Sequence, residues 1–253
     1  MRTTGRAGSA GVRLLGLLVA LALLGAACSD EGPATDLSGS EPVSFLSTDG
    51  VRLEGRLFGD GSSAVVLSHM RPADQRSWFD FAVRLAEAGY LILTFDFRGY
   101  CPGGEDGGCS EGETEIGALW QDVLGAIDFV RDRGASRVAL VGASMGGTAS
   151  LVAASQEGVD VGVVITLSAP ASIEGLVVDR DVLARISAAK LFAAGVGDAP
   201  YARDAESLFA LAPPPKRVEI LPSDDHGTDL LTGGQGEVVA RLIENHLERS
   251  GGP

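Results

Sequence analysis

Short apolar runs recur along the chain after residue 60, most of them without strict alternation of polar and apolar positions. Such runs are typical of strands that are covered on both faces of a sheet. Two further strand-like stretches precede them and are joined by Thr48-Asp49-Gly50, whose Asp-Gly pair is a turn signal that predicts a hairpin. The eight predicted strands span residues 43–47, 51–58, 64–68, 91–97, 137–142, 162–168, 190–196 and 217–221.

Helical stretches lie between most of these runs. They span residues 75–88, 115–133, 145–156 and 202–211, with a short one within 177–188 and a final amphipathic helix over 235–249. Because the crossovers after the third strand are helical, the pattern predicts an α/β fold with an eight-stranded, mostly parallel sheet and helices on both faces. Ligands bind beyond the carboxyl ends of the strands in such sheets, so the candidate chemistry is expected there.

The amino terminus differs from the rest of the chain. Basic residues are spread over residues 2–13, and residues 14–24 form an apolar run that is shorter than the ~20 residues of a membrane-spanning helix. We therefore interpret residues 1–27 as a signal peptide. Gly25-Ala26-Ala27 before Cys28 resembles a relaxed form of the lipobox of bacterial lipoproteins, whose cysteine receives a diacylglyceryl group. The resemblance implies a lipid-anchored protein on the extracytoplasmic face of the cell membrane; ordinary secretion after cleavage near Ala27 is the alternative.

Composition defines the remaining organisation. Residues 28–42 are polar, rich in Ser, Gly, Pro and acids, and predict a flexible tether, which leaves residues 43–253 as one folded domain. The chain has 253 residues, of which 45% are hydrophobic, enough for a sizeable core. Its net charge is −14, and the first 27 residues hold three arginines and no acid, so the remainder carries −17. This charge argues against nucleic acid as a partner and disfavours strongly anionic substrates.

A candidate nucleophile follows the predicted strand 137–142. The sequence Gly142-Ala143-Ser144-Met145-Gly146-Gly147 contains the pattern Gly-x-Ser-x-Gly. A serine on a sharp strand-to-helix turn requires small neighbours two residues to either side, and Gly142 and Gly146 meet this requirement. The string alone is a weak signal in a chain with 35 glycines, so the setting between a strand and a helix is the stronger evidence. A glycine-rich turn that merely closes a packed helix is the alternative.

A candidate base and acid occur later in the chain. His226 follows the last predicted strand, and Asp198 follows the strand 190–196. The chain order is then nucleophile, acid and base, in which His226 would accept the proton of Ser144 while Asp198 fixes the imidazole tautomer. His246 is interpreted as a surface or packing residue of the last helix. Among rival acids, Asp224 and Asp225 are both expected to be solvated loop charges, because a neighbour in sequence does not easily reach behind its own imidazole, and Asp225 ranks second to Asp198. Glu174 and Asp179 lie too far beyond their strand.

The oxyanion formed during carbonyl addition needs backbone donors. One candidate is the Met145 amide, at the helix start after the nucleophile. The second is the Met70 amide, in the turn after the third strand. Simple loop packing of His69 and Met70 is the alternative interpretation.

These motifs resemble the α/β-hydrolase superfamily over about residues 43–249, and their spacing resembles the lidless, dienelactone-hydrolase-like serine esterases. The resemblance rests on residues 142–147, 93–100, 195–198 and 225–227. It implies an α/β-hydrolase fold and roles in organising the loop after the fourth strand for Asp96 and Arg98. The chain departs from dienelactone hydrolases proper, which use a cysteine nucleophile, and from the many relatives that have His-Gly where it has His69-Met70.

Two cysteines, Cys101 and Cys109, flank a seven-residue glycine-rich segment after the fourth strand. With Cys28 taken by lipidation and the protein in an oxidising compartment, we expect these two to form a disulfide. Two cysteines do not complete a zinc site, and no phosphate-binding or dinucleotide-binding glycine motif is present, so no metal and no cofactor are implied.

The sequence thus predicts an extracytoplasmic serine hydrolase that cleaves carboxylic esters through an acyl-enzyme on Ser144. Only residues 169–189 separate the sixth and seventh predicted strands, so no large lid is expected and short or soluble esters are favoured as small-molecule substrates. A non-catalytic binding lipoprotein on a hydrolase scaffold, or a peptidase or acyltransferase with the same three residues, are the alternatives. The sequence does not predict an oligomeric state.

Overall fold

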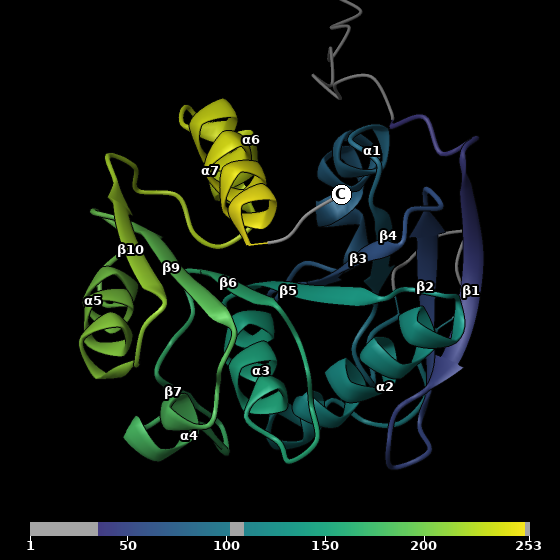
Figure 1. The fold of residues 1–253 in the computed structure, drawn as a ribbon, viewed down its shortest axis with the longest axis horizontal. Coiled ribbons are helices and arrows are strands. Elements are labelled where there is room, and N and C mark those ends of the chain that lie inside the picture. The colour runs from purple at the N-terminus through teal and green to yellow at the C-terminus, as the bar shows by residue number, and fades with distance from the viewer. Residues whose placement is uncertain (1–34, 102–108, 251–253) are drawn as a thin grey trace, which may run out of the picture. The chain divides into compact units, whose positions relative to one another are not determined.

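The computed structural model describes residues 35–101 and 109–250 (Figure 1). The predicted signal peptide, the predicted lipidation site Cys28 and the first part of the predicted tether, residues 28–34, therefore lie outside the described residues. Strand pairing begins at Ser40, inside the segment predicted as tether. Pro42 is tolerated there because this strand lies at the edge of the sheet, where a missing N–H costs no ladder hydrogen bond.

Eight strands form one sheet in the order β1-β2-β4-β3-β5-β6-β9-β10. Their bounds are β1 Ser40–Leu46, β2 Arg52–Phe58, β3 Ser63–Ser68, β4 Leu91–Phe95, β5 Arg137–Ala143, β6 Val163–Leu167, β9 Ala189–Gly195 and β10 Lys216–Leu221. The pairs β1–β2 and β2–β4 are antiparallel, and every other neighbouring pair is parallel. The predicted eight-stranded, mostly parallel sheet is confirmed.

Helices cover both faces of the sheet (Figure 1). The α-helices are α1 Phe79–Glu87, α2 Leu119–Asp132, α3 Met145–Ala154, α4 Arg180–Ala184, α5 Tyr201–Leu211, α6 Asp229–Thr232 and α7 Gly236–Arg249, and the 3₁₀ turns η1 Gln75–Trp78 and η2 Ile116–Ala118 precede α1 and α2. In the view of Figure 1, α1, α6 and α7 lie on one side of the sheet, with α2 and α3 on the other. The short helix α6 was not predicted from the sequence.

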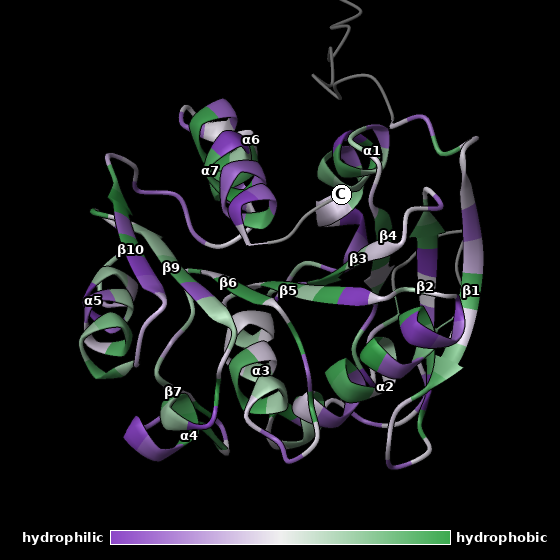
Figure 2. Ribbon diagram, in the orientation of Figure 1, coloured by the Kyte–Doolittle hydropathy of each residue, from purple (hydrophilic) through white to green (hydrophobic). Residues whose placement is uncertain are grey.

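Two hydrophobic clusters, one on each face, hold these layers together. Along β5, Val138 and Leu140 belong to the cluster that packs against α2 and α3, whereas Ala139 and Val141 belong to the cluster with α1 and α7. This alternation follows from the two-residue period of a strand, and it explains why the central strands have few polar positions. Figure 2 shows these strands as mostly hydrophobic, whereas α1 and α7 alternate hydrophobic and hydrophilic residues.

Only a small insertion separates β6 from β9. It consists of a two-stranded hairpin, β7 Ser172–Ile173 and β8 Leu176–Val177, followed by the five-residue helix α4. The hairpin was not predicted, because two-residue strands carry no periodicity. Between β6 and β9, where every residue is described, there is no large lid, as expected.

None of the helices in the described parts of the chain is long and apolar enough to cross a membrane.

Candidate active site

Ser144 occupies a strained turn between β5 and α3. Its backbone angles are φ 50° and ψ −120°, in a region that residues other than glycine rarely adopt. The turn is held from both sides: the Ser144 amide donates to the Leu167 carbonyl at 2.8 Å, and the Ser144 carbonyl accepts from the Gly147 amide at 3.0 Å. This is the geometry expected for a nucleophile elbow, which lifts the serine side chain out of the sheet.

The glycines around Ser144 allow neighbouring loops to approach closely. A Cβ at Gly146 would lie 2.5 Å from the His69 carbonyl oxygen and would also collide with the Ser68 carbonyl. A Cβ at Gly227 would lie 2.5 Å from Met70 Sδ and 3.4 Å from the Cβ of Ala143, the residue before Ser144. The turn after β3 and the loop containing His226 therefore both pack directly against the elbow.

Asp198 and His226 are brought together from two neighbouring strands, β9 and β10. Asp198 follows β9, and its Oδ2 lies 2.9 Å from Nδ1 of His226, with Oδ1 at 3.2 Å. The Asp198 side chain is 9% exposed and that of His226 is 27% exposed. A carboxylate at Nδ1 leaves Nε2 as the nitrogen that is free to accept a proton.

Ser144 and His226 do not form a hydrogen bond in this structure: neither the Ser144 hydroxyl nor His226 Nε2 has a hydrogen-bond partner among the described residues. Catalytic hydrogen bonds are often long or misaligned without substrate and shorten when it binds.

The rival acids are engaged elsewhere. Asp225 Oδ2 accepts a hydrogen bond from the Ser223 hydroxyl at 2.7 Å. Asp179 caps the start of α4. Glu174, at the tip of the β7–β8 hairpin, forms an exposed ion pair with Arg71 at 2.9 Å. Asp198 is thus the carboxylate that reaches the imidazole of His226.

The two predicted oxyanion donors lie on either side of the elbow. Met145 is the first residue of α3 and is fully buried, and Met70 is 6% exposed in the turn after β3. Within the described residues, neither the Met70 amide nor the Met145 amide donates a hydrogen bond. Unpaired backbone amides are uncommon in a protein interior, so both amides are available to bind an oxyanion.

His69 holds the turn that carries Met70. Its imidazole is fully buried; Nδ1 lies 2.8 Å from the Met70 carbonyl oxygen, and Nε2 lies 3.1 Å from the Phe97 amide. Because the carbonyl can only accept and the amide can only donate, the neutral tautomer protonated on Nδ1 satisfies both bonds. Burial lowers the pKa of His69 to about 4, which keeps the ring neutral. From the sequence, loop packing was the one role considered for His69.

Tyr100 and Tyr201 were not singled out from the sequence, and both contact this site. The Tyr201 ring lies 4.3 Å from the imidazole of His226, and the Tyr100 ring lies 4.6 Å from that of His69. From the sequence, Tyr100 was noted only as the last residue of the stretch 93–100 that contributes to the family resemblance. An aromatic residue near a strand end is too common to be a signal by itself.

Asp96 and Arg98 organise the connection after β4. Asp96 is buried and accepts two hydrogen bonds from Gln75; its burial raises its pKa to about 6. Arg98 is also buried and pairs with Asp122 on α2 and Asp49 in the β1–β2 turn. These contacts link four segments of the fold and do not touch the elbow.

The structure contains a disulfide between Cys101 and Cys109. In the described residues there is no group of three or more His, Cys, Asp or Glu side chains placed to hold a metal ion. His246 on α7 is half-buried, and burial lowers its pKa.

Comparisons with known proteins agree with this architecture. The family model described as "Alpha/beta hydrolase family" matches residues 63–243. The chain belongs to this family. The chain is 28% identical over 247 residues to a Salmonella typhi protein, the uncharacterized YfhR, covering 83% of this chain and 82% of YfhR. The predicted family and fold class are therefore confirmed.

Solved structures with the same fold include proteins that are named as esterases or as a dienelactone hydrolase. A dienelactone hydrolase from Anabaena variabilis superposes with a TM-score of 0.67 at 21% identity, covering 84% of this chain and 99% of that chain. An esterase from Pyrococcus furiosus superposes with a TM-score of 0.66 at 17% identity, covering 84% and 93%. These likenesses establish the fold of this chain.

Proposed function

We propose that this protein is a serine hydrolase that cleaves carboxylic esters through an acyl-enzyme on Ser144. The observation that carries the proposal is the Asp198–His226 hydrogen bond, formed in a loop that packs against the strained elbow of Ser144. A buried carboxylate at Nδ1 fixes the imidazole as a base, and a packing role for His226 would not require that arrangement.

The reaction follows from these groups. His226 Nε2 takes the proton of the Ser144 hydroxyl as Oγ forms a bond to the ester carbonyl carbon. The negative charge on the carbonyl oxygen is stabilised by the Met70 and Met145 amides. The C–O bond to the alcohol then breaks, and the alcohol leaves with the proton from His226. Water, deprotonated by His226, releases the acyl group, so one ester and one water yield one acid and one alcohol.

The substrates we propose are short or soluble esters. The insertion between β6 and β9 is limited to the β7–β8 hairpin and α4, so the described residues include no inserted domain between these strands that would enclose a long acyl chain. Each methylene left in water forfeits ~0.8 kcal/mol of transfer free energy.

The proposal extends to location. A basic segment, an apolar run and a cysteine at position 28 support export and attachment to the membrane by a lipid on Cys28, facing away from the cytoplasm. Growth of cells with a labelled fatty acid tests this. Label should enter the wild-type protein and be absent from Cys28→Ala; label that persists in Cys28→Ala contradicts the proposed anchor.

The decisive experiment for the enzyme uses residues 28–253 with Cys28→Ser, to keep the protein free of lipid. A fluorophosphonate probe should label this protein on Ser144, and ethyl butanoate should be hydrolysed. The Ser144→Ala variant should not be labelled, and its kcat should be about 10⁶-fold lower, while its fold should be unchanged. Folded protein that is neither labelled nor active would instead indicate a non-catalytic binding protein. Cleavage of peptides in preference to esters would indicate a peptidase.

A further inference from the structure

Tyr100 contacts both halves of the proposed oxyanion hole. Its ring packs edge-on against the ring of His69, with centroids 4.6 Å apart, and His69 in turn holds the Met70 carbonyl. Its hydroxyl donates to Met145 Sδ at 3.7 Å. One side chain thus connects the turn after β3 with the start of α3, which carry the two amides.

The backbone of Tyr100 is held within the loop that follows β4. Its amide donates to the Phe97 carbonyl at 3.0 Å, and its carbonyl accepts from the Ser110 amide at 3.1 Å. The next residue, Cys101, is bonded to Cys109. Tyr100 therefore lies at the base of a loop that the disulfide closes.

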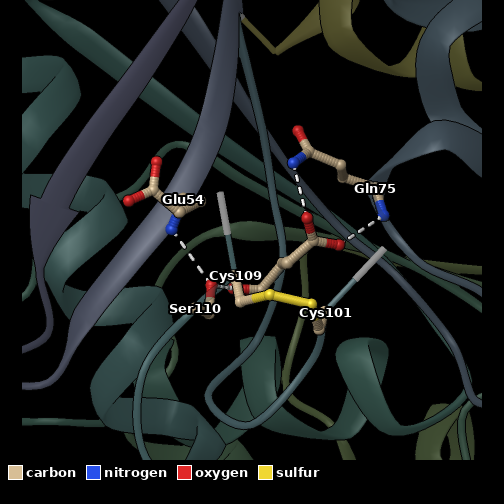
Figure 3. The surroundings of a disulfide bond; sticks show 6 residues. Glu54, Gln75, Cys101, Cys109 and Ser110 are labelled. Atoms are coloured by element: carbon tan, nitrogen blue, oxygen red, sulfur yellow. Dashed lines mark hydrogen bonds between the residues drawn. A yellow bond between two sulfur atoms is a disulfide. The ribbon is translucent and has the colours of Figure 1, made fainter. Parts of the chain in front are cut away.

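The other end of this loop is fixed to the sheet. Ser110 is buried; its hydroxyl donates to the Asp96 carbonyl at 2.6 Å and accepts from the Glu54 amide of β2 at 3.0 Å. Figure 3 shows Ser110 between Glu54 and the disulfide. Because Cys109 adjoins this fixed residue, the disulfide connects Cys101 and its neighbour Tyr100 to a rigid part of the sheet.

We propose that Tyr100 is a positioning residue of the oxyanion hole and that the Cys101–Cys109 disulfide holds it in place. The inference rests on the proposed esterase function and deepens it. Oxyanion donors must lie about 2.7–3.1 Å from the developing charge, so small displacements of the Met70 and Met145 amides weaken a contact that is made in the transition state. Losing Tyr100 should therefore reduce kcat and leave KM nearly unchanged.

The experiment compares kcat and KM for ethyl butanoate across matched variants. Tyr100→Leu should lower kcat about tenfold with KM within twofold, whereas Tyr100→Phe, which retains the ring contact with His69, should restore most of the activity. Cys101→Ala/Cys109→Ala should lower kcat at least threefold. A phosphine, which is oxidised to its oxide as it converts the disulfide to two thiols, should do the same to the parent protein and have no effect on the double alanine variant. Tyr90→Phe is the control, because Tyr90 is buried near the start of β4 and its hydroxyl has no partner.

A second readout does not depend on turnover. Hydrogen exchange at residues 69–71 and 145–147 should be faster in Tyr100→Leu and in the double alanine variant than in the parent protein, with exchange in α7 unchanged as a measure of intact fold. Unchanged exchange at both segments, or a kcat in Tyr100→Leu within twofold of the parent, overturns the role of Tyr100. If the parent protein itself does not hydrolyse esters, the proposed function is refuted. The hydrogen-exchange measurement would still test whether Tyr100 positions the two segments.

Discussion

The ring of Tyr201 packs against the imidazole of His226, with centroids 4.3 Å apart and the planes tilted by 53°. Tyr201 begins α5 and Asp198 lies three residues earlier, so one short segment holds both neighbours of the proposed base.

This contact predicts a role for Tyr201 in stabilising the imidazolium. When His226 accepts the serine proton it becomes a cation, and a cation beside an aromatic ring gains roughly 1 kcal/mol. Tyr201→Leu should lower kcat about fivefold, and Tyr201→Phe should retain the parent value because the ring is kept. Steady-state kinetics on one short ester decide the matter, and equal rates for the leucine and phenylalanine variants would contradict the prediction.

Asp198 and Asp225 provide a matched pair of substitutions. Asp198 bonds His226, whereas Asp225, next to His226 in sequence, bonds Ser223. Asp198→Asn should lower kcat by about 10³–10⁴-fold, because an amide does not fix the same imidazole tautomer. Asp225→Asn, which changes the net charge equally, should stay within threefold. A larger loss in Asp225→Asn than in Asp198→Asn would assign the acid to Asp225.

Gly146 determines how closely the turn after β3 approaches the elbow. A Cβ at this position would meet the carbonyl oxygens of Ser68 and His69, both of them backbone atoms that cannot rotate away. Gly146→Ala should reduce the free energy of unfolding by roughly 2–3 kcal/mol and also lower kcat. Chemical denaturation measures the first effect. Gly234→Ala is the control, since nothing lies within 4 Å of the added Cβ. Equal free energies of unfolding for the two variants would contradict the prediction.

The buried His69 predicts a loss of stability in acid. Its pKa is lowered from 6.5 to about 4 in the folded protein, so between these values the unfolded chain binds more protons. The free energy of unfolding should therefore fall as the pH drops through this window, by up to about 3 kcal/mol. His69→Asn removes the titrating ring and should flatten the pH dependence by a comparable amount in urea denaturation between pH 7 and pH 4. An unaltered dependence in His69→Asn would show that other groups cause it.

The small insertion between β6 and β9 predicts a preference for short acyl chains. Nitrophenyl esters of C2 to C4 acids should be hydrolysed with higher kcat/KM than the C16 ester in the same detergent, because an open site buries few of the methylenes of a long chain. Faster hydrolysis of the C16 ester would show that the site encloses long chains.

Local sequence patterns were sufficient for the elements that depend on periodicity and chain order. The apolar runs located six of the eight strands of the main sheet, because a strand covered on both faces needs apolar residues at nearly every position, and the Asp-Gly turn signal located the β1–β2 hairpin. The pattern around Ser144 located the turn between β5 and α3, because the strained backbone there requires glycines at fixed offsets. The spacing of Cys101 and Cys109 likewise indicated the disulfide that the structure contains.

Contacts between distant segments needed the tertiary structure. Asp198, Asp224 and Asp225 were all candidates as the acid from their positions in sequence, and only the adjacency of β9 and β10 shows which carboxylate reaches His226. The roles of His69, Tyr100 and Tyr201 depend on side chains from separate loops that meet at one edge of the sheet. Sequence determined which residues stand at the ends of strands, because that follows from local hydrophobicity, whereas packing decided which of them touch.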